Sequence, residues 1–186
     1  MEENDPNMTI SDGGLTVADD HLSYHGKKIL LSDVTAIRFG WLPIRFYHFT
    51  IGSKWMLVLK TTEQEVKINY PSYFGIFQDR QHEKFNTLLN VIWDSTVQRL
   101  FDTMIDEIDN GKIITIGKCT VSKDGISLYN FLIVWDDLVY QKNYNRLTIN
   151  SRSRSDIWTN LHYTETDNVQ LLMSFLEWKF ENTEAS

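Results

Sequence analysis

Short runs in which apolar and polar residues alternate recur in both halves of the chain, and turn-forming residues separate them. Asp19-Asp20 and Lys123-Asp124-Gly125 lie between two such runs, as the turn of a β-hairpin requires. The alternation has the two-residue period of a half-buried strand. Each half of the chain is therefore predicted to contain several antiparallel strands.

Further strands are predicted in the first half. Gly52-Ser53 separates the runs 46–51 and 54–61, and is interpreted as a turn. The alternation in 65–70 stops at Pro71, which predicts the end of a strand because proline has no backbone N–H to donate.

Two segments have apolar residues at the three- and four-residue spacing of a helix face. The longer runs from about Gln81 to Asn110, and Gly111 suits its end because glycine tolerates the left-handed conformation. We expect it to close the first half and lead into the second. The other segment lies near the C-terminus, and its predicted buried face is Val169, Leu172, Phe175 and Leu176.

The two halves resemble each other in sequence. Thr16–Val34 aligns without a gap to Thr120–Leu138, with six identities that include Asp33 and Asp137. Similar strand-like runs and a helix follow in both, which predicts a tandem repeat. About twenty additional residues are expected in the first copy, within Thr61–Gln81.

The shared pattern is T-V-x-x-D-G-I-x-L followed by I-x-W-D-D-L, at Thr120–Leu128 and Ile133–Leu138. A meander with this pattern that ends in an amphipathic helix resembles bacterial pleckstrin-homology-like (PH-like) domains. The resemblance implies an α+β fold of two tandem antiparallel β-meander units. Each is a partly open barrel closed by a C-terminal helix, and a long helix joins them. It also implies binding of proteins or lipid head groups, without catalysis.

The expected domain organisation follows from the repeat. We expect a flexible tail at 1–11, a PH-like repeat with the long helix at 12–110, a shorter repeat at 111–181 and a second tail at 182–186.

Composition narrows the possible classes. The 186 residues are 42% hydrophobic with a net charge of −7, which indicates a globular chain and argues against general coating of nucleic acid or anionic membrane. The acidic N-terminus and the absence of a long apolar run predict a cytoplasmic protein without a transmembrane segment.

Candidate catalytic and metal-binding residues are sparse. His21 and His25 flank a predicted strand, which places them about 13 Å apart, too far for one ion. Cys119 lacks a neighbouring base and is interpreted as a small buried residue. The recurrent Asp137 is interpreted as a turn cap that accepts backbone N–H groups. We therefore predict no catalytic residue, metal or cofactor, and an enzyme is the least favoured class.

Two windows contain no acidic residue, 34–62 and 138–155, and they occupy equivalent places in the repeat. One interpretation is that their hairpins bind anions such as lipid head groups or nucleic-acid backbone. The alternative is that the cations lie on the solvated face of half-buried strands, with the aromatic residues in the core. The candidate binding residues are Arg38, Arg45, His48, Lys54, Lys142, Arg146, Arg152 and Arg154.

The segment 69–77, N-Y-P-S-Y-F-G-I-F, concentrates aromatic residues. Packing against the start of the helix is the favoured interpretation, and an exposed patch for self-association is the alternative. The candidate interface residues are Trp41, Tyr73, Phe74 and Phe77. We predict a non-enzymatic binding or scaffold module, with a protein partner or a second copy favoured over an anionic ligand.

Overall fold

The computed structural model describes residues 10–18 and 20–183, and the chain is an α+β protein with four antiparallel sheets. It forms two compact units, Met1–Arg99 and Leu100–Ser186. Residues 1–9 and 184–186 of the two expected tails lie outside the described residues. Residues 10 and 11 belong to the first strand, and residues 182 and 183 belong to the last helix.

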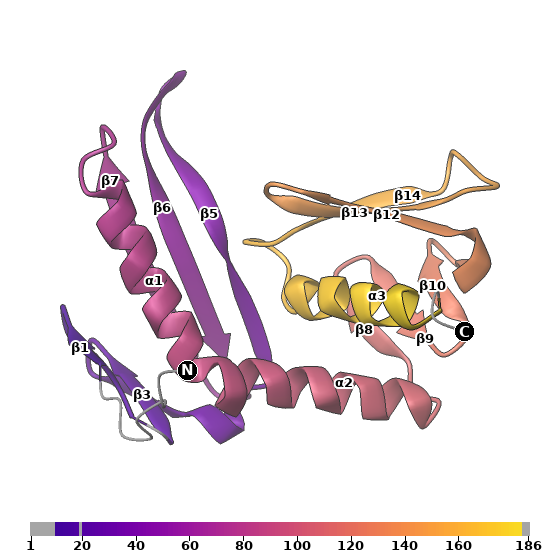
Figure 1. Ribbon diagram of the computed structural model, residues 1–186, viewed down its shortest axis with the longest axis horizontal. Helices are drawn as coiled ribbons and strands as arrows, with labels where there is room; N and C mark the ends of the chain where they lie inside the picture. Colours follow the sequence, from indigo (N-terminus) through magenta and orange to yellow (C-terminus); the bar gives the residue numbers. More distant parts are fainter. Residues whose placement is uncertain (1–9, 19, 184–186) are drawn as a thin grey trace. The chain divides into compact units, whose positions relative to one another are not determined.

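The first unit contains two sheets and a helix (Figure 1). A four-stranded sheet runs in chain order and is followed by the 3-10 turn η1 (Leu31–Asp33) and a three-stranded sheet, also in chain order. The first sheet comprises β1 (Ile10–Asp12), β2 (Leu15–Val17), β3 (His21–Tyr24) and β4 (Lys27–Leu30). The second comprises β5 (Ala36–Phe46), β6 (Phe49–Lys60) and β7 (Glu65–Tyr73), and is followed by α1 (Gln78–Ile92) and the π-helical segment η2 (Trp93–Gln98).

Part of the core of this unit lies between α1 and the sheet formed by β5–β7. Alternate residues of β7, among them Val66 and Ile68, are buried, and so are Phe85, Leu88 and Ile92 of α1. These are the two-residue and three-to-four-residue periods of a strand and a helix that share one core.

Arg99 connects the end of the helical segment to η1. Its guanidinium donates to the carbonyl oxygens of Leu31 at 3.1 Å and Val34 at 2.7 Å. Both carbonyls lie beside the turn between the two sheets, so this side chain provides partners for backbone groups that have none in a strand ladder.

From its first strand to its last helix, the second unit repeats the order of sheets, 3-10 turn and helix found in the first unit. It begins with α2 (Arg99–Asp109), whose first residue is the last of the first unit. The four-stranded sheet comprises β8 (Ile114–Ile116), β9 (Cys119–Ser122), β10 (Gly125–Leu128) and β11 (Phe131–Val134). After η3 (Trp135–Asp137) come β12 (Leu138–Asn143), β13 (Arg146–Ser151), β14 (Trp158–His162) and α3 (Val169–Thr183). The predicted helix face is confirmed, because Val169, Leu172, Phe175 and Leu176 are all buried.

The spacing of the first four strands is identical in the two units. Each of the strands β8–β11 begins 104 residues after its counterpart among β1–β4: Ile114 after Ile10, Cys119 after Leu15, Gly125 after His21, and Phe131 after Lys27. The turns also correspond. Positive φ angles occur at His25 and Gly26 in one unit and at Tyr129 and Asn130 in the other.

The predicted long helix consists of three consecutive helical segments, α1, η2 and α2. Their combined extent, Gln78 to Asp109, matches the predicted 81–110, although nothing in the sequence pattern indicated the π-helical segment. The compact units divide between Arg99 and Leu100, inside this helical stretch, whereas the predicted boundary lies after Asn110.

The turn predicted at Gly52-Ser53 is wrong. β6 continues through both residues, and its hairpin turn with β5 lies at Tyr47 and His48, between the paired residues Phe46 and Phe49. Gly52 serves a different purpose, because a Cβ atom there would lie 2.3 Å from the carbonyl oxygen of Ser72. It permits close approach of β7.

Pro71 does not end its strand. β7 continues to Tyr73, and Phe74 N–H donates to the Ile51 carbonyl at 2.8 Å. This bond fixes the phase of the antiparallel ladder, so that the nitrogen of Pro71 faces away from β6. Because β7 is an edge strand, the absence of an N–H group at Pro71 removes no hydrogen bond from the sheet.

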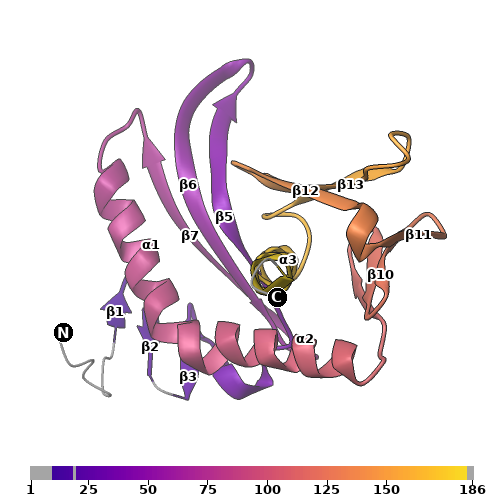
Figure 2. The same cartoon turned by 45° about the vertical axis from the view of Figure 1, so that its right-hand side comes forward.

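The additional residues of the first unit are placed differently from the prediction. β5 and β6 have 11 and 12 residues, whereas β12 and β13 have six each. Much of the extra length therefore lies in the β5–β6 hairpin, before the predicted 61–81. Figure 2 shows this hairpin extending past the end of β7.

The described sheets all have two free edges, since the first and last strands of each are unpaired with one another, and no sheet closes into a barrel. Among the described residues, no helix has the length and apolar character that crossing a membrane requires.

Candidate functional site

Exposed apolar side chains gather at one end of the first unit. We call this group the apolar tip, and its members are 50% to 83% exposed: Phe46, Tyr47, Phe49, Tyr73, Phe74, Ile76 and Phe77. Six of the seven are aromatic. The interpretation that the 69–77 segment packs on the helix start is therefore wrong for Tyr73, Phe74 and Phe77.

Strand register brings the two parts of the apolar tip together. Phe46, Tyr47 and Phe49 surround the β5–β6 turn, whereas the others belong to the end of β7 and the loop before α1. β7 ends opposite Gly52, and Phe74 is bonded to Ile51. Ile51 is two residues from Phe49, a distance of about 7 Å along a strand. The end of β7 and the hairpin turn lie at the same end of the sheet (Figure 1).

Three aromatic residues of the apolar tip adopt a backbone conformation that disfavours them. The φ angles of Tyr47, Phe74 and Phe77 are 52°, 53° and 62°. This left-handed region costs a non-glycine residue about 1–2 kcal/mol. Their side chains are exposed, so burial does not compensate for the cost. Folding alone would favour glycine or asparagine here, and strained residues of this kind concentrate at functional sites.

The loop that carries Phe74 and Ile76 is fixed by specific hydrogen bonds. The buried Ser72 hydroxyl donates to the Ile76 carbonyl at 2.7 Å, and Ile76 N–H donates to the Tyr73 carbonyl at 2.9 Å. These bonds hold the loop in one conformation, so its aromatic side chains are presented in a defined arrangement.

Two of the predicted binding residues lie at the apolar tip. Arg45 and His48 are exposed, and in sequence they flank Phe46 and Tyr47 on the hairpin. Arg80, in the first turn of α1, is exposed near the other part of the tip, next to Asp79. The structure thus combines Arg45 and His48 with the predicted interface residues Tyr73, Phe74 and Phe77.

The remaining candidates of the first unit lie elsewhere. Arg38 is seven residues from Arg45, about 23 Å along β5, and its guanidinium forms an ion pair with Glu65 at 3.1 Å. Lys54 is half-buried in β6. Trp41 is half-buried in β5 opposite Trp55, and is not part of the tip.

In the second unit, two candidate cations are already paired within the chain. Lys142 forms an ion pair with Glu177 of α3, which raises the pKa of the lysine. The guanidinium of Arg154 donates two hydrogen bonds to Asp156, at 3.0 and 2.8 Å. Its bonding holds the pKa of the Asp156 carboxyl below the ordinary value. A ligand would have to displace these carboxylates.

The basic loop between β13 and β14 is organised by Asp137, as predicted for a turn cap. The carboxylate accepts hydrogen bonds from the Ser151 hydroxyl and, at 2.8 Å, from Ser153 N–H. The Ser151 bond is the main reason that the pKa of Asp137 is lowered. Arg152 is exposed on this loop, whereas Arg146 begins β13 at the far end, six residues or about 20 Å away. The four cations of this unit therefore do not form one patch.

The predicted burial of Cys119 is confirmed. Its side chain is fully buried, its thiol donates to the Ile116 carbonyl at 3.1 Å, and burial raises the thiol pKa to about 12. A protonated, enclosed thiol is a poor nucleophile. Within residues 10–18 and 20–183, no three His, Cys, Asp or Glu side chains are grouped to hold a metal ion.

No family model, curated protein or solved structure matches the chain significantly.

Sequence reasoning did not select Phe49 and Ile76 for the apolar tip. The feature that would have identified Phe49 is the hairpin turn at Tyr47 and His48. The sequence pattern did not predict this turn because neither residue is a typical turn former. With that turn recognised, Phe49 would have been placed beside Phe46 at the exposed end of a hairpin.

Proposed function

We propose that the chain is a non-enzymatic binding module of two tandem PH-like units that contacts a protein partner through the apolar tip and requires no cofactor. Two features support the PH-like interpretation. In each unit, a four-stranded and a three-stranded meander precede a helix. The constant spacing of 104 residues between corresponding strands supports a duplicated origin.

The observation that carries the protein-binding role is the exposure of the apolar tip. An aromatic residue has about 200 Å² of surface, so seven residues at 50% to 83% exposure present roughly 900 Å². The largest apolar patch of a typical monomer is about 300–600 Å². A standard protein interface buries about 800 Å² on each partner. The summed exposed area of the apolar tip is therefore comparable to the area that one partner buries in a standard protein interface.

The residues around the tip indicate the chemistry of the partner. Arg45, His48 and Arg80 are exposed beside the aromatic side chains, with Asp79 as the neighbouring acid. Aromatic and arginine side chains are the types most enriched among interface residues that contribute large binding energies. The fitting partner surface is an apolar pocket with acidic residues at its rim.

The test uses two variants of the full chain. Phe49→Ser with Phe77→Ser removes two side chains of the tip, and Leu132→Ser, at an exposed apolar position of β11, is the matched control. We expect the wild type and the control to recover the same stoichiometric partner, and the tip variant to lose it. Sedimentation velocity measures self-association in the same three proteins. Equal recovery and equal mass for all three would refute the proposal.

An anionic bilayer is the second candidate partner of the apolar tip. The observation that favours it is the absence of acidic residues from 34–62, which contains Arg45, His48 and three aromatic residues of the tip. Aromatic side chains beside cations suit the interface between lipid and water. Cosedimentation with vesicles of phosphatidylcholine and phosphatidylserine separates the two candidates. Salt-sensitive binding that the tip variant loses would favour the membrane, whereas indifference to vesicles favours a protein.

A further inference from the structure

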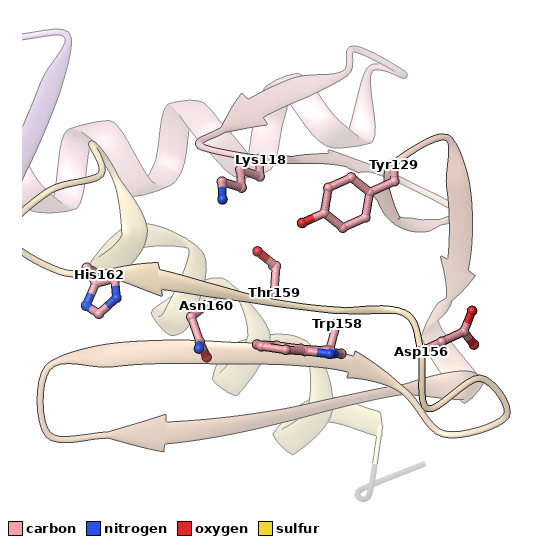
Figure 3. A pocket seen from close by; sticks show the side chains of 7 residues that line it. All are labelled: Lys118, Tyr129, Asp156, Trp158, Thr159, Asn160 and His162. Carbon is pink, nitrogen blue, oxygen red and sulfur yellow. The ribbon is translucent and has the colours of Figure 1, made fainter.

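The second unit contains a hollow of about 430 Å³ beside strand β14. Figure 3 shows the side chains of Lys118 and Tyr129 across from the strand that carries Trp158, Asn160 and His162. Lys118 belongs to the β8–β9 turn and Tyr129 to the β10–β11 turn. The hollow therefore lies between the turns of one sheet and the edge strand of the other.

The outer edge of β14, the strand that lines this hollow, has no partner strand among the described residues. β14 pairs only with β13 among the described strands. The bonds from Ser151 N–H to the Ile157 carbonyl, 3.0 Å, and from Tyr163 N–H to the Asn145 carbonyl, 3.1 Å, fix the phase of the ladder. Along an antiparallel strand, the backbone N–H and C=O groups of successive residues point alternately toward the partner strand and away from it. The N–H and C=O groups of Trp158, Asn160 and His162 therefore face away from β13. The His162 carbonyl already accepts from Glu165 N–H at 3.2 Å and from Thr166 N–H at 3.0 Å.

An edge of this kind is a template for another strand. The outward-facing groups repeat at every second residue from Trp158 to His162, a span of about 13 Å. That repeat matches the main chain of an extended peptide, which can bond to the N–H groups of all three residues and to the carbonyls of Trp158 and Asn160. A small anion could bond to only one or two of these groups at a time.

The charges around the hollow favour an acidic partner. Lys118 is exposed, and its ammonium group has no ion pair among the described residues. Asp156 also lines the hollow, but the guanidinium of Arg154 already binds both oxygens of its carboxylate. The uncompensated charge of the lining is therefore positive. Trp158 is about half exposed and offers a flat apolar surface beside it.

We propose that β14 binds an extended segment of a partner protein as an added strand, with an Asp or Glu side chain of that segment paired to Lys118. This site uses residues of the second unit alone and does not depend on the apolar tip. The main-chain hydrogen bonds would hold any extended segment. Lys118 would add selectivity for a segment with an acidic side chain at the facing position.

The experiment titrates the 15N-labelled full chain with the peptide acetyl-Thr-Val-Glu-Val-Thr-amide to millimolar concentration. The N–H groups of Trp158, Asn160 and His162 should become protected from hydrogen exchange. Those of Thr159 and Leu161, which already face β13, should not change. This alternation distinguishes strand addition from other modes of binding. Absence of binding, or protection without alternation, would overturn the proposal.

Modified peptides test the main-chain bonds. Only one edge of an added strand faces β14, and the N–H groups of alternate peptide residues lie on opposite edges. One modified peptide is N-methylated at both valines, and the other is N-methylated at the first threonine and the glutamate. One of these two peptides should lose binding, and the other should keep it. Equal binding of the two N-methylated peptides would contradict strand addition. If sodium glutamate alone shifts the Lys118 and Tyr129 signals as strongly as the peptide does, the hollow is a small-anion site and the proposal fails.

Charge exchange tests the role of Lys118. An exposed ion pair contributes about 0.2–1 kcal/mol, and reversal replaces attraction by repulsion. Lys118→Glu should therefore weaken binding of the glutamate peptide about fivefold, and it should prefer a peptide with lysine at the central position. Lys123→Glu, in the exposed β9–β10 turn, is the matched control and should bind as the wild type does. Equal binding by both variants would refute the pairing. The Phe49→Ser, Phe77→Ser variant should keep full peptide binding, so failure of one site is distinguishable from failure of the other.

Discussion

Replacing Phe74 by asparagine separates the role of this side chain in folding from its role in binding. Phe74 and Gly75 have φ angles of 53° and 73°, and Ile76 N–H bonds to the Tyr73 carbonyl. Two central residues with positive φ are the mark of a type I′ turn, for which Asn-Gly is the preferred pair. Phe74→Asn therefore supplies the residue that the backbone conformation favours.

The magnitude follows from exposure and backbone strain. Phe74 is 78% exposed, so its covered surface is on the order of 45 Å² of roughly 200 Å². At about 25 cal/mol per Å², losing that contact costs about 1 kcal/mol. Relief of the left-handed conformation returns about 1–2 kcal/mol. The expected net change is a gain of about 0 to 1 kcal/mol in the free energy of unfolding.

Urea unfolding of the full chain, followed by tryptophan fluorescence, measures this change. Phe85→Ala is the control, because Phe85 is only 2% exposed and truncation of a buried phenylalanine costs about 3–5 kcal/mol. Partner recovery is measured on the same protein preparations. We expect Phe74→Asn to keep or gain stability while it loses partner binding.

A loss of more than about 2 kcal/mol in Phe74→Asn would refute this reasoning, because it would mean that the side chain contributes to a core. Unchanged stability together with unchanged partner recovery would show that the exposed ring has no part in binding.

Four other substitutions and treatments have defined outcomes. Because the pKa of Asp137 is lowered in the folded chain, its stabilising contribution is present above the ordinary pKa of about 3.9 and is lost as the pH falls below it; Asp137→Asn should flatten that part of the stability–pH curve measured by urea unfolding. The Cys119 thiol should resist a disulfide reagent at pH 8 in the folded protein and react once urea unfolds it, because burial raises its pKa to about 12. Leu172→Ala should lower the free energy of unfolding by about 2–5 kcal/mol, since Leu172 is fully buried in α3. Gly52→Ala should destabilise the β6–β7 pairing by about 1–3 kcal/mol, which hydrogen exchange in β7 would detect, because its Cβ would lie 2.3 Å from a backbone oxygen.

The α+β class and the faces of the helices could be predicted because their signals are local. The spacing of Leu88 and Ile92 in α1, and of Leu172 and Leu176 in α3, is that of one helix face, and all four are buried. The order of the short strands followed in the same way from alternation and from turn residues such as Asp124 and Gly125. These patterns depend only on the period of the backbone.

The misplaced turn illustrates the limit of local reasoning. Gly52 lies within β6, where β7 passes too close to leave room for a Cβ atom, whereas Tyr47 occupies the turn despite its positive φ. A glycine required for close approach and a glycine required for a turn are identical in sequence. The predicted strand end at Pro71 was wrong because local sequence does not show strand pairing. Only the pairing of β6 with β7 reveals that the nitrogen of Pro71 faces the unpaired edge of β7.

The candidate sites depended even more on tertiary structure. Tyr73, Phe74 and Phe77 were recognisable as an aromatic segment, but whether aromatic side chains face a core or solvent depends on what the rest of the chain places against them. Lys118 and Trp158 are 40 residues apart in sequence and line the same hollow.

The sequence by itself therefore determined the two similar halves, the kinds of elements in each and the residues that face each helix core, because backbone periodicity and turn chemistry act over a few residues. Strand register decided which hairpin became long, which aromatic side chains were left in solvent and which edge of β14 stayed open. Register is a property of paired strands, and it depends on contacts between residues that are distant in the chain.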